Sequence, residues 1–166
     1  MTLSKTMVAP HAAAATEQPL ATLAAYDALK KGGNAFDAAV AASLALGVTF
    51  HPAGGLGGDF FGMFYEAKTG RVHCLNASGW APSGLTLDLV KSKSDGQIPT
   101  YGPLTCVVPG MVAGVWETHQ RFGSMEFSDL VRPALDYAAQ GFPAGEAFCR
   151  SLVGAYSDLS PEARAV

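Results

Sequence analysis

The sequence predicts an α+β fold (a layered α/β arrangement), in which a largely antiparallel sheet is covered by helices. The expected elements follow in the order strand, two helices, hairpin, strand and helices, and no βαβ repeat appears among them. Nearly half of the 166 residues are hydrophobic and only 15% are charged, which gives a chain of this length a large core. We therefore expect a single domain over residues 1–166 and no dinucleotide-binding sheet.

The first expected elements are a short strand at 7–15 and two helices. The first helix begins near Pro19, since the N–H that proline lacks is unpaired at a first helical position anyway, and it ends at Gly32, which can adopt a left-handed closing conformation. Asn34 caps the second helix, with Asp37 three residues on completing a capping box. That helix is apolar all round, which is typical of a core element. We expect it to leave exposed apolar surface around it in the isolated chain.

A glycine-rich bend and a hairpin follow. The segment 51–61 contains Pro52 and four glycines, which predicts a compact, non-helical bend. Strands are expected at 60–67 and 71–78, joined by a turn at 68–70. Their alternation of apolar residues is imperfect, so we expect one strand to be buried on both faces.

The rest of the chain is predicted to be mainly helical. We expect a loop at 80–103 with a short helix around 87–91, a strand at 104–108, a helix at 111–122, a helix at 129–140 capped by Ser128, a final helix at 145–156 and a polar tail. Pro133 should bend the helix at 129–140 or delay its start.

Charge and apolar patterning exclude several function classes. The net charge is −3 and no basic stripe exists, which gives nucleic-acid binding little support. The first ten residues lack the apolar core of a secretory signal, and the apolar run 35–50 is interrupted and too short to span a bilayer. We therefore expect a soluble, cytoplasmic protein with no membrane partner.

The cysteines and histidines predict neither a metal nor a cofactor. Cys74, Cys106 and Cys149 are far apart without CxxC spacing, which argues against a disulfide framework or a zinc site. Each is interpreted as a small buried hydrophobic residue. The four histidines stand alone in the sequence and are interpreted as structural or surface residues.

The sequence alone offers no complete catalytic constellation. The bend at 53–60 precedes a strand instead of following one and breaks the GxGxxG spacing, so close backbone packing explains its glycines better than nucleotide binding does. GxSxG and HExxH motifs are absent. Asp37 and Asp59 are interpreted as backbone caps instead of catalytic acids. Thr2 is an alternative nucleophile if Met1 is removed, although a loose tail follows it.

Four blocks, in family order, resemble the large subunit of the gamma-glutamyltransferase (gamma-glutamyltranspeptidase) family. They lie at 19–22, 30–41, 52–61 and 108–114, with a weaker match at 141–143. The block KKGGNAFDAAVA at 30–41 is the most specific. The resemblance implies part of an N-terminal nucleophile hydrolase αββα sandwich. It also implies an autoprocessing precursor that cleaves into a large and a small subunit.

The resemblance further implies which chemistry lies outside this chain. In the family, the N-terminal threonine of the small subunit attacks a gamma-glutamyl amide, and water or an amine then takes the acyl group. The chain matches only the first part of the large subunit, so no catalytic residue is expected in it. The expected partners are the small-subunit chain, in a heterodimer or a dimer of heterodimers, and a gamma-glutamyl or other small amide substrate.

The resemblance also indicates a substrate-binding segment. Family members carry roughly L-D-F-R-E-T-A-P after the hairpin, and the arginine grips the glutamyl α-carboxylate. This sequence has LNASGWAP at 75–82, with Ser78 in place of the arginine. We therefore expect Ser78 and Trp80 to be substrate-binding residues. Trp80 is either an apolar wall for the acyl group or a packing residue beneath a loop.

Three functions remain open from the sequence. The first is a gamma-glutamyl transferase or hydrolase. The second is an acylase-type amidohydrolase that is not specific for gamma-glutamyl groups, which the loss of the arginine favours. The third is a stand-alone structural or binding domain without the catalytic half.

Overall fold

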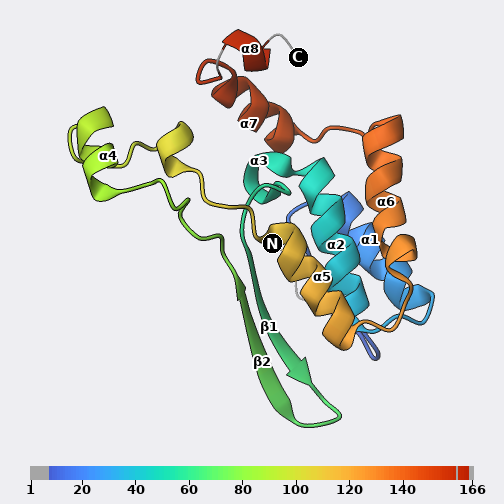
Figure 1. Ribbon diagram of the computed structural model, residues 1–166. Helices are drawn as coiled ribbons and strands as arrows, with labels where there is room; N and C mark the ends of the chain where they lie inside the picture. The colour runs from blue at the N-terminus through green and yellow to red at the C-terminus, as the bar shows by residue number, and fades with distance from the viewer. Residues whose placement is uncertain (1–7, 160, 165–166) are drawn as a thin grey trace, which may run out of the picture. The chain divides into compact units, whose positions relative to one another are not determined.

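The structure, a computed structural model, describes residues 8–159 and 161–164 and divides into two compact units. The first unit comprises Met1–Gly55 and Thr118–Val166, and the second comprises Leu56–Glu117. The single domain expected over 1–166 stays a prediction. The elements in chain order are α1 (Pro19–Lys30), α2 (Ala35–Thr49), α3 (His51–Gly54), β1 (Phe60–Glu66), β2 (Arg71–Ala77), α4 (Leu87–Lys93), a 3-10 turn (Pro103–Thr105), α5 (Met111–Phe122), α6 (Phe127–Gln140), α7 (Glu146–Tyr156) and α8 (Pro161–Arg164) (Figure 1).

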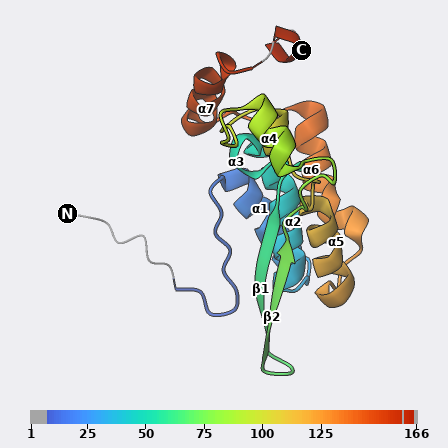
Figure 2. The same ribbon diagram turned by 60° about the vertical axis from the view of Figure 1, so that its left-hand side comes forward.

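Helices α1, α2 and α6 form the core of the first unit. They lie side by side in both views (Figures 1 and 2), and α2 packs against both α1 and α6. Ala25, Ala38 and Ala42 are buried between α1 and α2, where their small side chains let the two helices approach closely. The α6 residue Leu130 is among the largest fully buried side chains. The expectation that the second helix is a core element is confirmed.

Helix α1 has both ends expected from the sequence. Pro19 is its first residue. Gly32 follows the helix with a φ of 94°, in the left-handed region that favours glycine. The Gly33 amide donates to the Ala28 carbonyl (2.9 Å) and the Gly32 amide to the Leu29 carbonyl (3.1 Å), the two bonds of a Schellman closure.

The start of α2 is tied to the connection between α5 and α6. Asn34 and Asp37 form the expected capping box, in which Asp37 Oδ2 accepts the Asn34 amide (2.8 Å). The same carboxylate accepts the Ser124 amide (2.9 Å), the Ser124 hydroxyl (2.6 Å) and the Met125 amide (3.3 Å). Asp37 is 0% exposed. Its role as a backbone cap is confirmed. The same carboxylate also joins the start of α2 to the connection between α5 and α6.

The environment of Asp37 predicts a pH dependence of stability. Burial alone would raise its pKa, but the hydrogen bonds from Ser124, Asn34 and Met125 together lower the pKa below the usual value of 3.8. Because the folded-state pKa is lower than the unfolded one, the ionised carboxylate stabilises the fold fully above about pH 4. This contribution is lost as the pH falls through the folded-state pKa. In urea titrations, we expect the difference in free energy of unfolding between wild type and Asp37→Asn to shrink below pH 4. The difference between wild type and Asp158→Asn, an exposed control, should stay small from pH 3 to 7.

Two expectations are wrong here: the strand at 7–15 and the absence of a helix at 51–54. Val8–Ala15 contains no strand, because no other segment pairs with it in the described chain; Met7 and Thr2 lie outside the described residues. His51–Gly54 forms one helical turn instead of a non-helical bend, since Pro52 is tolerated in a first turn.

Helix α6 begins at Phe127, so Ser128 lies inside it and is not its cap. The reason is that Met125 is held just before the helix, by Asp37 at its amide and by His119 Nε2 at its carbonyl (2.8 Å). Pro133 does not delay the helix. Gly141, with a φ of 81°, follows the end of α6 as expected, and α7 matches the final helix expected at 145–156.

The second unit is built on the expected hairpin. Strands β1 and β2 pair antiparallel, with Met63 opposite Cys74 and Phe60 opposite Ala77 (Figure 1). The outer face of the hairpin is exposed and carries Phe61, Met63, Tyr65, Val72, Cys74 and Asn76. The expectation of a strand buried on both faces is wrong, because residues alternate between a covered and an open face along both strands.

The exposed apolar surface therefore lies in a different place from the one expected. In α2 only Ala35 is exposed, whereas Phe61, Met63, Tyr65 and Val72 on the hairpin are each at least 60% exposed. The expectation of exposed apolar surface around the second helix is wrong. The helices of the first unit cover α2, while the outer face of the hairpin stays open.

The expected strand at 104–108 is also wrong. This segment consists of the end of a 3-10 turn and extended chain without a ladder, and its Val108 amide bonds to the Trp80 carbonyl in a loop instead. Cys74, Cys106 and Cys149 are free and exposed, so their interpretation as buried residues is wrong. Within the described residues, no group of three or more His, Cys, Asp and Glu side chains could hold a metal ion.

None of the helices in residues 8–159 and 161–164 is both long enough and apolar enough to cross a bilayer.

Candidate functional site

The candidate site is the segment Asn76–Trp80, which leaves the end of β2 in the second unit. It contains both residues expected to bind substrate. Ser78 is exposed, and Trp80 is 86% exposed. A packing role for Trp80 beneath a loop is not what the structure shows, because so little of the side chain is covered. The role of both residues in substrate binding stays a prediction.

Two side-chain oxygens hold successive amides of this segment. Asn76 Oδ1 accepts the Ser78 amide (2.9 Å), and Asp59 Oδ1 accepts the Gly79 amide (3.1 Å). Asp59 comes directly before β1 and Asn76 lies near the end of β2, so the pairing of the strands brings both acceptors to one place. Asp59 is the backbone cap that the sequence indicated, and its partner is a loop amide twenty residues away.

A second chain segment fixes the same loop from another side. The Val108 amide donates to the Trp80 carbonyl (2.9 Å). A Cβ atom at Gly79 would overlap the carbonyl of Val108, and one at Gly110 would overlap the carbonyl of Ala77. Glycine is required at both positions because two backbones touch there. The backbone of Ser78–Trp80 is therefore held in place while its side chains remain open to solvent.

The glycine-rich bend before β1 supports the start of α5. The Gly58 carbonyl accepts the amides of Gly110 (3.2 Å) and Met111 (2.9 Å), which would otherwise be unpaired at a helix N-terminus. Gly58 thus presents an acceptor to a protein segment, whereas a phosphate loop presents amide donors to a ligand. This geometry agrees with close backbone packing as the reason for the glycines in this bend.

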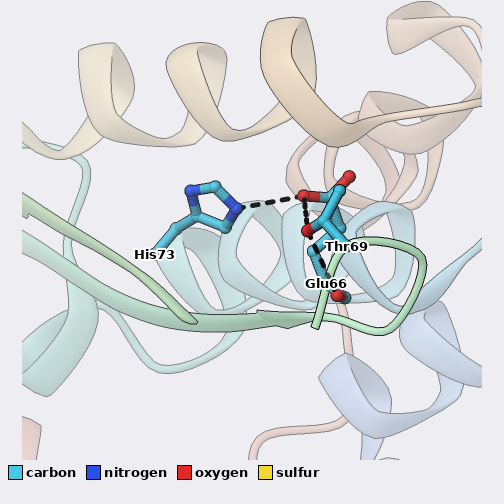
Figure 3. A network of polar contacts seen from close by, with 3 residues as sticks. All are labelled: Glu66, Thr69 and His73. Atoms are coloured by element: carbon cyan, nitrogen blue, oxygen red, sulfur yellow. Dashed lines mark hydrogen bonds and ion pairs between the residues drawn. The ribbon is translucent and has the colours of Figure 1, made fainter. Parts of the chain in front are cut away.

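A polar network lies near the turn of the hairpin (Figure 3). The Glu66 carboxylate accepts a hydrogen bond from the Thr69 hydroxyl (2.6 Å) and contacts His73 Nε2 (3.1 Å). The Thr69 hydrogen bond first, and the His73 hydrogen bond second, lower the pKa of Glu66. The carboxylate lies between the hydroxyl and the ring, so the imidazole is not placed to activate Thr69 as a nucleophile. We interpret this network as a clamp on the turn.

Sequence reasoning missed this clamp. Thr69 follows Glu66 by three residues in the turn, and His73 comes seven residues after Glu66 on the second strand. The only signal that could have found the clamp is the hairpin register, because it returns position 73 to the same face as position 66.

The exposed side chains of the candidate site offer a hydroxyl and an aromatic ring. The Ser78 hydroxyl can donate and accept hydrogen bonds but cannot neutralise a carboxylate. The exposed Trp80 ring offers an apolar, π-rich surface. Among the described residues, no lysine or arginine forms an ion pair with Asp59, whose carboxylate accepts the Gly79 amide of this segment.

Comparisons with known proteins point to one family. A model of the family described as gamma-glutamyltranspeptidase matches residues 21–166. The chain is 41% identical to the Bacillus subtilis (strain 168) "Glutathione hydrolase-like YwrD proenzyme" over 132 residues, which are 79% of this chain and 25% of the relative. It is 35% identical to the "Glutathione hydrolase proenzyme" of the same strain over 150 residues, 88% of this chain and 26% of the relative. The chain thus spans about a quarter of the length of these curated relatives.

Solved structures of two enzymes are similar to this chain over most of its length. The gamma-glutamyltranspeptidase of Helicobacter pylori superposes with a TM-score of 0.84 at 30% identity, covering 92% of this chain and 44% of the other. The cephalosporin acylase of Bacillus halodurans superposes with a TM-score of 0.79 at 31% identity, covering 97% of this chain and 32% of the other.

Proposed function

The chain belongs to the gamma-glutamyltranspeptidase family of N-terminal nucleophile hydrolases, and from this premise we propose that it is the first part of the large subunit of an autoprocessing amide-cleaving enzyme. Members of the family are enzymes, and the curated relatives are proenzymes. We place the nucleophile, a threonine that begins the small subunit after self-cleavage, in the portion of the protein beyond this chain. The role of this chain is to supply the scaffold and one wall of the acyl-binding site.

The proposed reaction has two steps. The threonine hydroxyl attacks the amide carbonyl while its own α-amine accepts the proton, and the amine product leaves after protonation with an acyl-enzyme remaining. Water or an acceptor amine then attacks the ester carbonyl, the acyl group is released, and the threonine hydroxyl is restored. Donors that stabilise the tetrahedral oxyanion are needed in both steps.

We propose an acyl specificity that differs from that of gamma-glutamyl enzymes. The observation that carries this proposal is Ser78, which stands where an arginine is expected from the family pattern, on a loop whose backbone is held at Ser78, Gly79 and Trp80. Without the guanidinium, the glutamyl α-carboxylate has no bidentate partner at this position. Similarity to a cephalosporin acylase is consistent with an acylase-type enzyme.

The outer face of the hairpin is the proposed contact with the remainder of the same protein. A two-stranded hairpin is marginally stable alone and needs more strands or packing against another layer. Phe61, Met63, Tyr65 and Val72 leave one face of this hairpin apolar and exposed. About three quarters of the length of the curated relatives lies outside the matched region. The small-subunit chain of the same precursor is therefore the proposed partner, in a heterodimer.

The test is expression of the whole precursor, followed by mass spectrometry and anilide assays. We expect self-cleavage into two chains, with a threonine at the new N-terminus, and hydrolysis of valeryl p-nitroanilide, which carries no charge on its acyl group, in preference to the gamma-glutamyl compound. A precursor that stays intact and inactive would overturn the enzyme function. Efficient gamma-glutamyl turnover by wild type would overturn the specificity only.

Restoring the guanidinium should restore gamma-glutamyl recognition. We expect Ser78→Arg to raise kcat/KM for gamma-glutamyl p-nitroanilide about tenfold, because a charge-assisted hydrogen bond contributes about 1.5–3 kcal/mol. Ser83→Arg, in an exposed turn of the same unit, is the matched control and should leave kcat/KM unchanged. An equal rise in both variants would mean that added positive charge acts without a specific contact.

A further inference from the structure

Asp59 places a negative charge beside the candidate acyl site. Its Oδ1 atom lies 3.1 Å from the Gly79 amide nitrogen, and that nitrogen is bonded directly to the carbonyl carbon of Ser78. The carboxylate is therefore within one residue of the side chain that replaces the expected arginine. Asp59 is itself exposed, so a ligand bound at Ser78 can approach it.

The charge of Asp59 is not neutralised by the described part of the chain. Its one hydrogen bond comes from the neutral Gly79 amide, and no lysine, arginine or histidine of the described residues forms an ion pair with it. An arginine at position 78 would place a positive charge next to this carboxylate. With Ser78 in its place, no cationic side chain at position 78 offsets the charge of this carboxylate.

Trp80 adds a feature that favours cations. Its ring is 86% exposed on the same fixed loop, with its backbone carbonyl bonded to Val108. The face of an indole ring attracts ammonium groups through its quadrupole. A carboxylate hydrogen-bonded to the Gly79 amide and an exposed indole at the next residue form a combination that suits a positively charged group and repels a carboxylate.

We infer that Asp59 and Trp80 make this site select acyl groups that carry an ammonium group or no charge, and reject acyl groups that end in a carboxylate. This inference rests on the proposed function and names the class of acyl group that the same site accepts. Asp59 is a specificity-determining residue in this scheme. A unit charge a few ångströms away changes binding about fivefold even in a largely aqueous site, and more as the site closes.

The test uses the processed whole protein and three p-nitroanilides of equal acyl length: glutaryl, valeryl and 5-aminovaleryl. We expect wild type to hydrolyse the 5-aminovaleryl compound best and the glutaryl compound worst. Asp59→Asn keeps an oxygen acceptor for the Gly79 amide but removes the charge. It should raise the ratio of glutaryl to 5-aminovaleryl kcat/KM about fivefold or more. Asp88→Asn, on the exposed face of α4, is the matched control.

Two outcomes overturn the inference. One is an unchanged ratio in Asp59→Asn, and the other is an equal fall for all three substrates, which would mean that Asp59 only supports the loop. If wild type cleaves none of the anilides, the proposed function fails instead. Calorimetric titration with 5-aminovaleramide and with the monoamide of glutaric acid then tests the charge preference without turnover. The inference requires that wild type binds 5-aminovaleramide and that Asp59→Asn binds it more weakly.

Discussion

Replacing Asp37 by alanine should lower the free energy of unfolding by about 3 kcal/mol or more and the melting temperature by about 10 °C. Asp37 is fully buried and accepts the amides of Asn34, Ser124 and Met125 as well as the Ser124 hydroxyl. Alanine leaves these donors without their acceptor, and each buried, unsatisfied donor costs about 1–3 kcal/mol. A loss of this size is a large fraction of the stability of an ordinary domain.

The measurement is thermal and urea unfolding, with Asp158→Ala as the matched control. Asp158 is exposed, and no hydrogen bond of its side chain occurs among the described residues, so its replacement should change stability by less than about 0.5 kcal/mol. The Asp37→Ala effect should exceed that of Ser124→Ala, because the serine variant removes one donor and leaves the carboxylate three others. Equal, small effects in Asp37→Ala and Asp158→Ala would contradict the assignment of Asp37 as the tie between α2 and the α5–α6 connection.

The predictable part of this fold is local in sequence. The partners in the Asn34–Asp37 box are three residues apart, the partners in the closure at Gly32 and Gly33 are at most five apart, and α5 was predicted with its observed bounds. Each of these features depends on residues within a turn or two of helix. The second partner of Asp37 could not be predicted in this way, because Ser124 lies 87 residues further along the chain.

The wrong predictions share a physical cause. The segments 7–15 and 104–108 have strand-like composition, but a strand exists only when another strand pairs with it, and sequence patterns do not supply that partner. The cysteines were predicted to be buried because their neighbours are apolar. Cys74 instead lies on the outer face of the hairpin, together with Met63 opposite it. Apolar alternation could not show that this face is left open by the described chain.

The candidate site was predicted in part. Ser78 and Trp80 came from a family resemblance, and the structure places them on one loop with a fixed backbone. Asp59 was predicted to be a backbone cap, which is correct. Its position beside Ser78 depends on the pairing of β1 with β2, so the negative charge at the site could be found only from the structure.

The rigidity of this loop leads to the second large effect, for Gly79→Ala. The added Cβ would overlap the carbonyl carbon and oxygen of Val108, which are backbone atoms and cannot rotate away. The two segments must separate, and the hydrogen bond from the Val108 amide to the Trp80 carbonyl is lost. We expect a destabilisation of about 1–3 kcal/mol from overpacking. We also expect a fall in kcat/KM of about 100-fold on the best anilide substrate, because a displacement of about 1 Å in a positioning segment has effects of that size.

Gly84→Ala separates this steric effect from a general cost of replacing glycine. Gly84 lies in the following turn of the same unit, a methyl group added to it would meet no atom within 4 Å, and it does not have a positive φ. Its replacement should leave stability within about 0.5 kcal/mol of wild type and activity unchanged. If Gly79→Ala behaves like Gly84→Ala, the loop is not held against Val108, and the fixed presentation of Ser78 and Trp80 on which the acyl specificity depends is wrong. If Gly79→Ala is stable but inactive, the close contact at this glycine serves substrate positioning more than folding.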